Sequence, residues 1–124
     1  LILVAEDERD IRELIVITLN TNGLTNIIQA SNGKDAVAKA KTHKPVLILM
    51  DVRMPQMSGY EACEMLKVDP NTSDIPVVFL SAKGQEAEVK HGIQVGAEDY
   101  ILKPFAPDQL TSQIKKILAK YGKA

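Results

Sequence analysis

The chain has 124 residues, of which 45% are hydrophobic and 25% are charged, and its formal net charge is -1. This length fits one globular domain whose core buries about two-thirds of the surface that the unfolded chain exposes. The near-neutral charge gives no general attraction to nucleic acid or to an anionic membrane, and the lone cysteine, Cys63, excludes an internal disulfide. We therefore expect a cytoplasmic domain with no direct nucleic-acid or membrane partner. The start within an apolar run, without an initiator methionine, indicates a domain taken from a longer protein.

Apolar runs of strand length alternate with amphipathic helical runs, which is typical of a parallel sheet covered by helices. The first run, Leu1–Ala5, predicts a strand, and a helix follows from about Asp10 to the pair Asn22-Gly23. The apolar stripe of this helix is formed by Ile11, Leu14, Ile15 and Leu19. Residues 26–30 predict the second strand. Asn32-Gly33 then opens a helix that ends at His43-Lys44, before Pro45.

The most apolar run, residues 46–50, predicts a third strand covered on both faces, and Asp51 follows it. Ser58 and Glu61 have the spacing of a capping box for a helix that ends before Asp69. Residues 76–80 predict the fourth strand, residues 85–95 a helix, and residues 99–102 a short fifth strand. Pro107 starts a final helix, whose predicted stripe is Leu110, Ile114, Ile117, Leu118 and Tyr121.

Polar residues follow four of these strands. They are Glu6 and Asp7 after the first, Asp51 after the third, Ser81 and Ala82 after the fourth, and Lys103-Pro104 after the fifth. The carboxyl ends of parallel strands share one edge of a sheet, so we expect these groups to lie together. Three carboxylates suit Mg²⁺, and a metal beside an ammonium and a hydroxyl group suits a phosphoryl group attacked by a carboxylate. Taken singly, Asp7 is equally well explained as a helix cap, Lys103 as a solvated lysine and Ser81 as a turn residue.

In these features the chain resembles the receiver domain of two-component response regulators. The resemblance rests on the acidic pair Glu6-Asp7, the segment Met50–Gly59 around Asp51, the pair Ser81-Ala82 and the run Lys103-Pro104-Phe105. It covers the whole chain, residues 1–124, as a single receiver domain. The implied fold class is α/β, a flavodoxin-like (βα)5 arrangement with a doubly wound five-stranded parallel sheet of order 2-1-3-4-5.

The resemblance also implies how phosphorylation takes place. Asp51 is the phospho-acceptor, and the donor is a histidine kinase or a phosphotransfer protein. The cofactor is Mg²⁺, bound by Asp7, by Asp51 and by the backbone carbonyl of Arg53, with Glu6 acting through water. Ser81 and Lys103 bind the phosphoryl oxygens, while the small Ala82 leaves the phosphate accessible.

Two further expectations concern signalling. The peptide bond between Lys103 and Pro104 is cis in the family, and Tyr100 matches an aromatic that turns inward when Ser81 moves toward the phosphate. Judged without the family, Tyr100 is a half-buried anchor of the fifth strand. Phosphorylation shifts the surface of the fourth helix, fifth strand and fifth helix, which controls a downstream partner or output domain or produces a dimer. Gly92 either eases this rearrangement or allows close helix packing.

The resemblance implies a signalling domain that catalyses only its own phosphoryl transfer and autodephosphorylation. A Mg²⁺-dependent phosphatase of the haloacid-dehalogenase type needs a second acid two residues after the nucleophile, where this chain has Arg53. A flavin-binding flavodoxin needs a loop rich in Ser, Thr and Gly after the first strand, where this chain has residues 6–9, Glu-Asp-Glu-Arg. An inactive, receiver-like interaction module would lack an acid, the hydroxyl or the lysine. Arg53, together with Glu6 where many relatives have aspartate, leaves the metal geometry and the lifetime of the phosphorylated state open.

Overall fold

The computed structural model describes residues 1–82, 86–103 and 105–122. Five strands alternate with five helices along the described chain. The strands are β1 (Ile2–Ala5), β2 (Ile27–Ala30), β3 (Leu47–Asp51), β4 (Val77–Ala82) and β5 (Asp99–Lys103). The helices are α1 (Arg9–Thr21), α2 (Gly33–His43), α3 (Gly59–Val68), α4 (Glu86–Gln94) and α5 (Pro107–Lys120).

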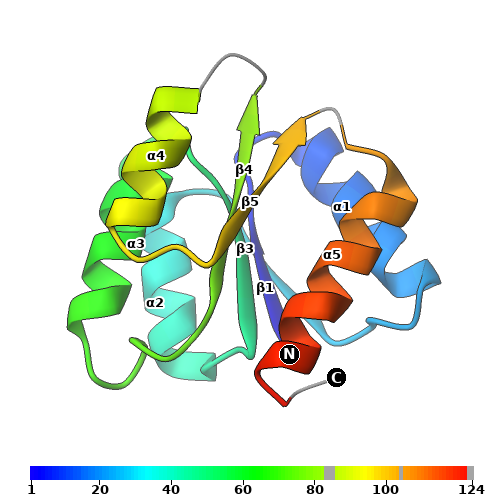
Figure 1. The fold of residues 1–124 in the computed structure, drawn as a ribbon, viewed down its shortest axis with the longest axis horizontal. Helices are drawn as coiled ribbons and strands as arrows, with labels where there is room; N and C mark the ends of the chain where they lie inside the picture. The colour runs from blue at the N-terminus through cyan, green and yellow to red at the C-terminus, as the bar shows by residue number, and fades with distance from the viewer. Residues whose placement is uncertain (83–85, 104, 123–124) are drawn as a thin grey trace.

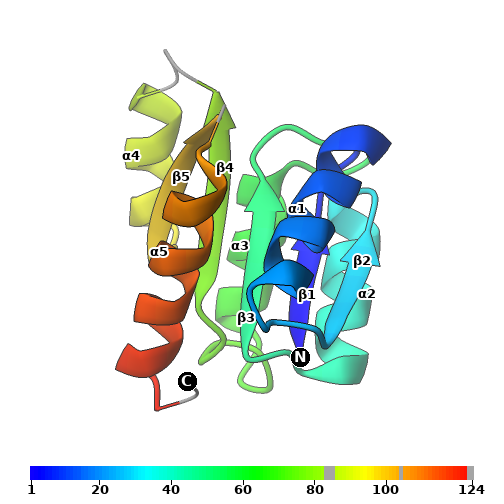
Figure 2. The same ribbon diagram turned by 90° about the vertical axis from the view of Figure 1, so that its right-hand side faces the viewer.

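The strands form one parallel sheet, as the sequence pattern predicts, in the order β2-β1-β3-β4-β5 that the family resemblance implies. Helices α2, α3 and α4 lie on one face of this sheet, and α1 and α5 lie on the other (Figure 1). The view turned by 90° shows the sheet between these two layers (Figure 2). This is the doubly wound α/β arrangement.

Each face of the sheet has its own hydrophobic core. Alternate residues of a strand point to opposite faces, so Leu3 and Ile48 pack under α2 and α3, while Val4 and Leu49 pack under α1 and α5. All residues of β3 are buried, as expected for a central strand covered on both sides. The core therefore holds the end of β3, and with it Asp51, in a fixed position.

Two predicted helix caps and one predicted helix end are confirmed. The Asn32 side chain accepts a hydrogen bond from the backbone N–H of Asp35 and caps α2. Ser58 and Glu61 form the predicted capping box at the start of α3, with each side chain bonded to the other residue's backbone N–H. Lys44 ends α2 in the left-handed conformation before Pro45.

Some predicted boundaries and core residues are wrong. Ser81 and Ala82 do not follow β4, because the ladder continues through the pairs Ser81↔Leu102 and Ala82↔Lys103. Asp51 and Lys103 are likewise the last residues of their strands. Leu14 is 50% exposed, at an open groove between α1 and Phe105.

Tyr121, predicted in the apolar stripe of the last helix, is 40% exposed and lies just after α5. Its hydroxyl donates to Glu98 Oε2 at 2.7 Å, so a polar contact and not core burial determines its place. Gln85, the predicted first residue of the fourth helix, lies outside the described residues.

Gly92 shows the close packing that is one of the two roles considered for it. A Cβ atom at this position would lie 2.5 Å from Phe79 Cε2 and 3.2 Å from Tyr60 Cε1. The absence of a side chain thus lets α4 pack closely against β4 and α3. None of the helices in the described ranges is both long and apolar enough to cross a membrane.

Candidate functional site

The strand register brings the predicted site residues to one edge of the sheet. Ala5 lies beside Met50, Asp51 beside Leu80, and Ala82 beside Lys103. The four strands are parallel, so their carboxyl ends all lie at the edge that is uppermost in Figure 1. Glu6 and Asp7 follow β1 directly and reach the same edge.

Lys103 links two acids that are far away in sequence. Its Nζ lies 2.9 Å from Glu6 Oε1 and 3.1 Å from Asp51 Oδ2. The Glu6 side chain is fully buried, and the side chains of Asp51 and Lys103 are mostly buried. Both ion pairs are therefore only weakly screened by solvent.

Glu6 has an unusual protonation equilibrium. Burial raises its pKa, as do the carboxyl groups of Asp51 and Asp7, and Lys103 opposes this only partly, so that the pKa of Glu6 reaches about 8. Burial lowers the pKa of Lys103, but Glu6 and Asp51 outweigh that effect and raise it above the ordinary value. Among the described residues of this cluster, negative charge is thus in excess around the Lys103 ammonium group.

The excess of negative charge suits a divalent cation. One carboxylate oxygen from each of Glu6, Asp7 and Asp51 lies within 4.8 Å of the others. Glu6 and Asp51 are buried, whereas Asp7 is exposed. A few carboxylate oxygens with an open, solvated side form the type of site that Mg²⁺ prefers, because this ion retains part of its water shell. These three residues could therefore hold a metal ion.

The backbone around Asp51 is held by close packing. A Cβ atom on Gly59 would collide with the carbonyl oxygen of Asp51, so only glycine allows α3 to start this close to the end of β3. The Gly59 N–H donates to the Val52 carbonyl at 3.0 Å. The Arg53 N–H lies 3.5 Å from Asp51 Oδ1, at the outer limit of a hydrogen bond.

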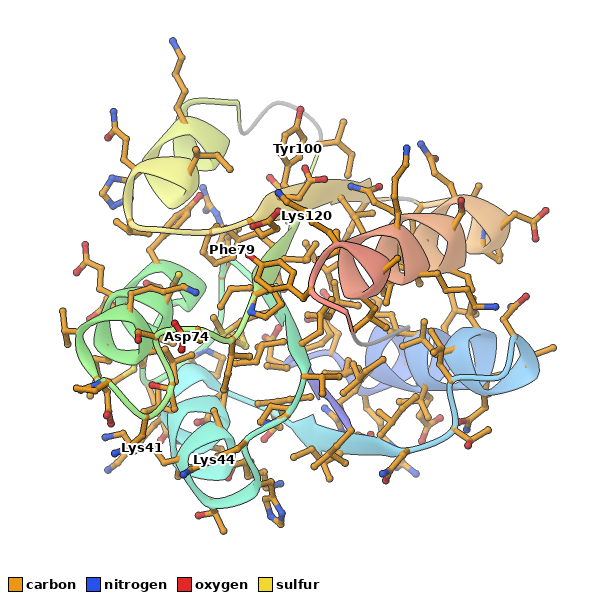
Figure 3. The ribbon with its side chains drawn as sticks, turned by 60° about the horizontal axis from the view of Figure 1, so that its bottom comes forward. Lys41, Lys44, Asp74, Phe79, Tyr100 and Lys120 are labelled. Carbon is orange, nitrogen blue, oxygen red and sulfur yellow. The ribbon has the colours of Figure 1, made fainter. Side chains whose placement is uncertain are left out.

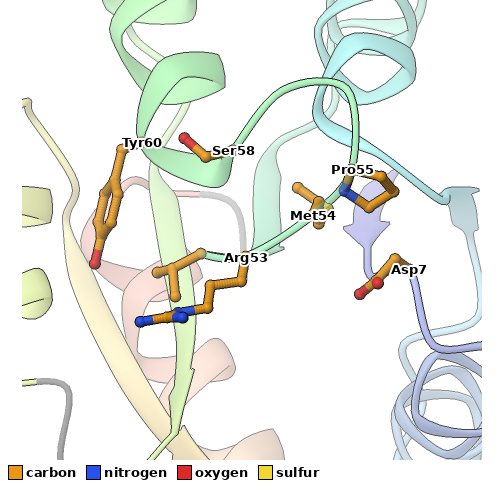
Figure 4. A pocket seen from close by; sticks show the side chains of 7 residues that line it. Asp7, Arg53, Met54, Pro55, Ser58 and Tyr60 are labelled. Carbon is orange, nitrogen blue, oxygen red and sulfur yellow. The ribbon is translucent and has the colours of Figure 1, made fainter.

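An open groove of about 730 Å³ adjoins the acids. Asp7 borders it on one side and Tyr60 on the other, and Arg53 and Pro55 lie between them (Figure 4). The Arg53 side chain extends toward Tyr60 and away from Asp7.

The remaining predicted residues lie on β4 and β5. Ser81 is buried, near the end of β4, and Ala82 is the last residue of that strand. Tyr100 is 39% exposed. Pro104, with the predicted cis bond, lies outside the described residues.

Two supporting residues were not predicted from the sequence. Gly59 lies in the Met50–Gly59 segment, but nothing in the sequence shows that its Cα faces the Asp51 carbonyl. Arg12 donates from Nη1 to the Glu6 carbonyl at 2.8 Å and from Nε to Gln29 Oε1 at 3.1 Å, and so fixes the chain after β1. No sequence signal distinguishes Arg12 from a solvated arginine on the outer side of a helix.

Comparison with known proteins gives one consistent family. Residues 2–115 match the model of the response regulator receiver domain. The chain is 42% identical over 121 residues to the phosphate regulon transcriptional regulatory protein PhoB of Pseudomonas aeruginosa, covering 98% of this chain and 52% of that protein. It is 40% identical over 119 residues to PhoB of Escherichia coli, covering 96% and 52%. The chain thus spans about half the length of these curated relatives.

Solved structures agree with the sequence relatives. A putative response regulator from Chloroflexus aurantiacus superposes with a TM-score of 0.90 at 30% identity, covering 95% of this chain and 96% of that one. The chemotaxis response regulator CheY4 of Vibrio cholerae superposes with a TM-score of 0.87 at 28% identity, covering 94% and 97%. The shared architecture includes the strand edge that carries the acid cluster.

Proposed function

Because this chain belongs to the family of response regulator receiver domains, we propose that its carboxylate Asp51 is the phospho-acceptor of a two-component signalling system. The observation that carries this proposal is the Lys103 ammonium group, which bridges Asp51 and the buried Glu6 at the carboxyl edge of the sheet. Asp51 is held in a fixed position, with the Lys103 ammonium group 3.1 Å from its carboxylate. The neighbouring acids Glu6 and Asp7 could bind a metal ion together with it. The other groups of the cluster can therefore serve the chemistry of Asp51.

We infer the transfer step from the acid cluster together with the roles that the family implies. A carboxylate oxygen of Asp51 attacks the phosphorus of the donor, a new P–O bond forms, and the bond to the leaving group of the donor breaks. Mg²⁺, held by Asp7, Asp51 and the Arg53 carbonyl with Glu6 acting through water, would neutralise charge on the phosphoryl oxygens. Lys103 and the Ser81 hydroxyl then bind those oxygens, and the small Ala82 leaves access to them.

Phosphorylation changes the partners of Lys103. The phosphoryl group brings about two negative charges close to Asp51 and competes with Glu6 for the ammonium group. We infer that Lys103 and Ser81 shift toward it, that Tyr100 turns inward from its exposed position, and that the surface of α4, β5 and α5 changes with them. A ligand shifts such an equilibrium only by its different affinity for the two states, and the new phosphate contacts supply that difference.

The partners follow from the family. The phosphoryl donor is a histidine kinase or a phosphotransfer protein, and the changed surface controls an output domain, a separate target or a second copy of the chain. Several relatives are transcriptional regulatory proteins about twice as long as this chain. Receiver domains are signalling domains and not conventional enzymes. We propose that residues 1–124 form one such domain in the cytoplasm, with activity limited to its own phosphorylation and autodephosphorylation.

The phosphatase alternative is not favoured. A haloacid-dehalogenase-type site needs a second acid two residues after the nucleophile, and that position holds Arg53, whose side chain points away from Asp7. An inactive receiver-like module is disfavoured by the complete set of acids, hydroxyl and lysine.

Intact mass spectrometry tests the proposal. The chain is incubated with acetyl phosphate, with either Mg²⁺ or a chelator. We expect one added phosphoryl group with Mg²⁺, little without it, and none for Asp51→Asn. Glu8→Gln is the matched control, because it removes an exposed acid close to the cluster. Equal labelling of Asp51→Asn and the wild type would refute the role of Asp51.

A further inference from the structure

The two outer strands of the sheet each have an unpaired edge that could bind another strand. In the order β2-β1-β3-β4-β5, each of β2 and β5 has one side without a neighbouring strand. The main-chain N–H and C=O groups on such a side form a template for pairing with another chain, and proteins usually block it. The side chains that bond to these main-chain groups therefore show how this sheet avoids pairing with another chain.

At the β2 edge, the outward-facing residues are Ile27 and Gln29. Ile2 N–H donates to the Asn26 carbonyl, and Glu6 N–H donates to the Ala30 carbonyl. Residues 26 and 30 thus face β1, and the alternation along a strand makes Gln29 face outward. Lys39 of α2 donates from Nζ to the Gln29 carbonyl at 2.5 Å. A charged side chain from the adjacent helix therefore covers the centre of this edge.

At the β5 edge, the outward-facing residues are Tyr100 and Leu102. Ile48 N–H and Val52 N–H donate to the carbonyls of Pro76 and Leu80, so even-numbered residues of β4 face β3 and odd-numbered ones face β5. Phe79 therefore faces β5, directly opposite Tyr100. In a parallel pair, a residue bonds to the two residues that flank its opposite partner, so Tyr100 faces outward.

Both main-chain groups of Tyr100 are occupied by side chains. The Tyr100 N–H donates to Asp99 Oδ1 at 2.8 Å, and Gln113 of α5 donates from Nε2 to the Tyr100 carbonyl at 3.0 Å. Gln113 Nε2 also donates to Asp99 Oδ2 at 3.0 Å, which joins the two side chains into one unit. The same arrangement therefore occurs at both edges: a helix side chain donates to the carbonyl of one of the two outward-facing residues.

The two edges differ in how strongly they are protected. The β2 edge carries the charge of Lys39, whereas Gln113 at the β5 edge is neutral. Tyr100 and Leu102 are 39% and 45% exposed, and Tyr100 projects away from the sheet (Figure 3). A groove of about 480 Å³ runs beside β5, lined by Asp99, Gln109 and Gln113 among others. The β5 edge thus has the room and the exposed apolar side chains for another strand.

We propose that two sets of side chains, which we call latches, prevent strand pairing at the edges of the sheet: Gln113 with Asp99 at β5, and Lys39 at β2. Loss of Gln113 turns β5 into a pairing surface for a second copy of this chain. The occupant follows from the β5 sequence, Asp-Tyr-Ile-Leu-Lys, which has no net charge, no proline and strong strand formers. Antiparallel pairing of two copies about Ile101 would set Asp99 opposite Lys103. The test of this association uses the unphosphorylated chain and leaves the acid cluster unaltered.

The test compares Gln113→Met with Gln109→Met in the full chain. Both variants replace an amide on α5 by a flexible apolar side chain beside the same groove. Within the described part of the chain, only Gln113 of these two bonds to the β5 main chain. Sedimentation equilibrium measures self-association, and hydrogen exchange of the Tyr100 amide locates it. Thermal melts establish that both variants are folded.

We expect Gln113→Met to associate about threefold to tenfold more tightly than Gln109→Met, which is the net effect of freeing one main-chain hydrogen-bonding group. The Tyr100 amide should become more protected as the concentration of Gln113→Met rises. Equal association of the two variants, or a monomeric Gln113→Met, would overturn the proposal. Pairing of the wild type through β5 would also overturn it.

Two further comparisons keep the proposal testable if Gln113→Met does not fold. Asp99→Ala removes the acceptor of the Tyr100 N–H, and exchange of this amide should accelerate about fivefold or more. Lys39→Met should associate more than Lys34→Met, since both remove one charge from α2 but only Lys39 covers β2. Unchanged Tyr100 exchange would refute the β5 latch, and equal behaviour of the lysine variants would refute the β2 latch.

Discussion

Replacement of Asp51 by asparagine should stabilise the metal-free protein. Asp51 shares the carboxyl edge with Glu6 and Asp7, whose oxygens lie within 4.8 Å of its own, while Lys103 is at 3.1 Å. The substitution keeps the size of the side chain and an oxygen that can accept from Lys103. It removes one negative charge from a site that has an excess of them.

The magnitude follows from these distances. At an effective dielectric constant of about 20, two unit charges about 4–5 Å apart interact by about 3–4 kcal/mol. Asp51→Asn removes the repulsion from the two acids, but it also removes the attraction to Lys103, about 5 kcal/mol at 3.1 Å on the same scale. It relieves in addition the desolvation cost of a buried carboxylate, which is several kcal/mol. Because burial raises the pKa of Glu6 to about 8, this acid is largely neutral at pH 7 and contributes less than a full charge. The expected net gain for Asp51→Asn is about 1 kcal/mol at neutral pH, and it should increase above pH 8.

Thermal melts with and without Mg²⁺, at matched ionic strength, measure this effect. For a domain of this size, about 1 kcal/mol corresponds to a shift in Tm of about 4 °C. Mg²⁺ at about 100 times its dissociation constant should stabilise the wild type by about 2.7 kcal/mol, and Asp51→Asn less, because a ligand is lost. Equal metal-free stability together with an equal response to Mg²⁺ would show that these carboxylates do not share a site.

Three further predictions concern other residues of the site and its support. The folded-state pKa of Glu6, about 8, lies above its ordinary value of 4.5. The stability of the metal-free protein should therefore fall as the pH rises from about 4.5 to about 8, by on the order of 4 kcal/mol, and urea melts of Glu6→Gln should lack this slope. Gly92→Ala should lower stability by about 1–3 kcal/mol because of its contact with Phe79; a gain of about 1 kcal/mol, the helix-propensity effect, would show that packing does not require glycine. Gly59→Ala should cost roughly 3 kcal/mol in the same melts and slow the phosphorylation of Asp51, and unchanged values would contradict the close contact with the Asp51 carbonyl.

Much of the fold can be predicted from local pattern. The continuous apolar run of β3 and the capping box of Ser58 and Glu61 are signals within a few residues, and both are confirmed. The strand ends were less predictable. Ser81 and Lys103 extend their strands because each is next to a paired neighbour, and the hydrophobicity of the chain contains no information about that neighbour.

The site, like the fold, can be predicted from the sequence only in part. The residue types at the ends of four strands predict that the acids and Lys103 meet, because a parallel sheet brings those ends to one edge. The raised pKa of Glu6 could not be predicted, because it depends on complete burial and on the positions of Asp51 and Asp7. The role of Gly59 is also hidden, since it depends on the distance between two backbones.

Mapping the phosphoryl group tests the central claim most directly. After incubation with acetyl phosphate and Mg²⁺, the chain is digested under acidic conditions, which preserve an acyl phosphate, and its peptides are sequenced by tandem mass spectrometry. The account predicts one phosphoryl group, located on Asp51. A phosphoryl group on Glu6, on Asp7 or on either histidine, with Asp51 unmodified, would contradict it.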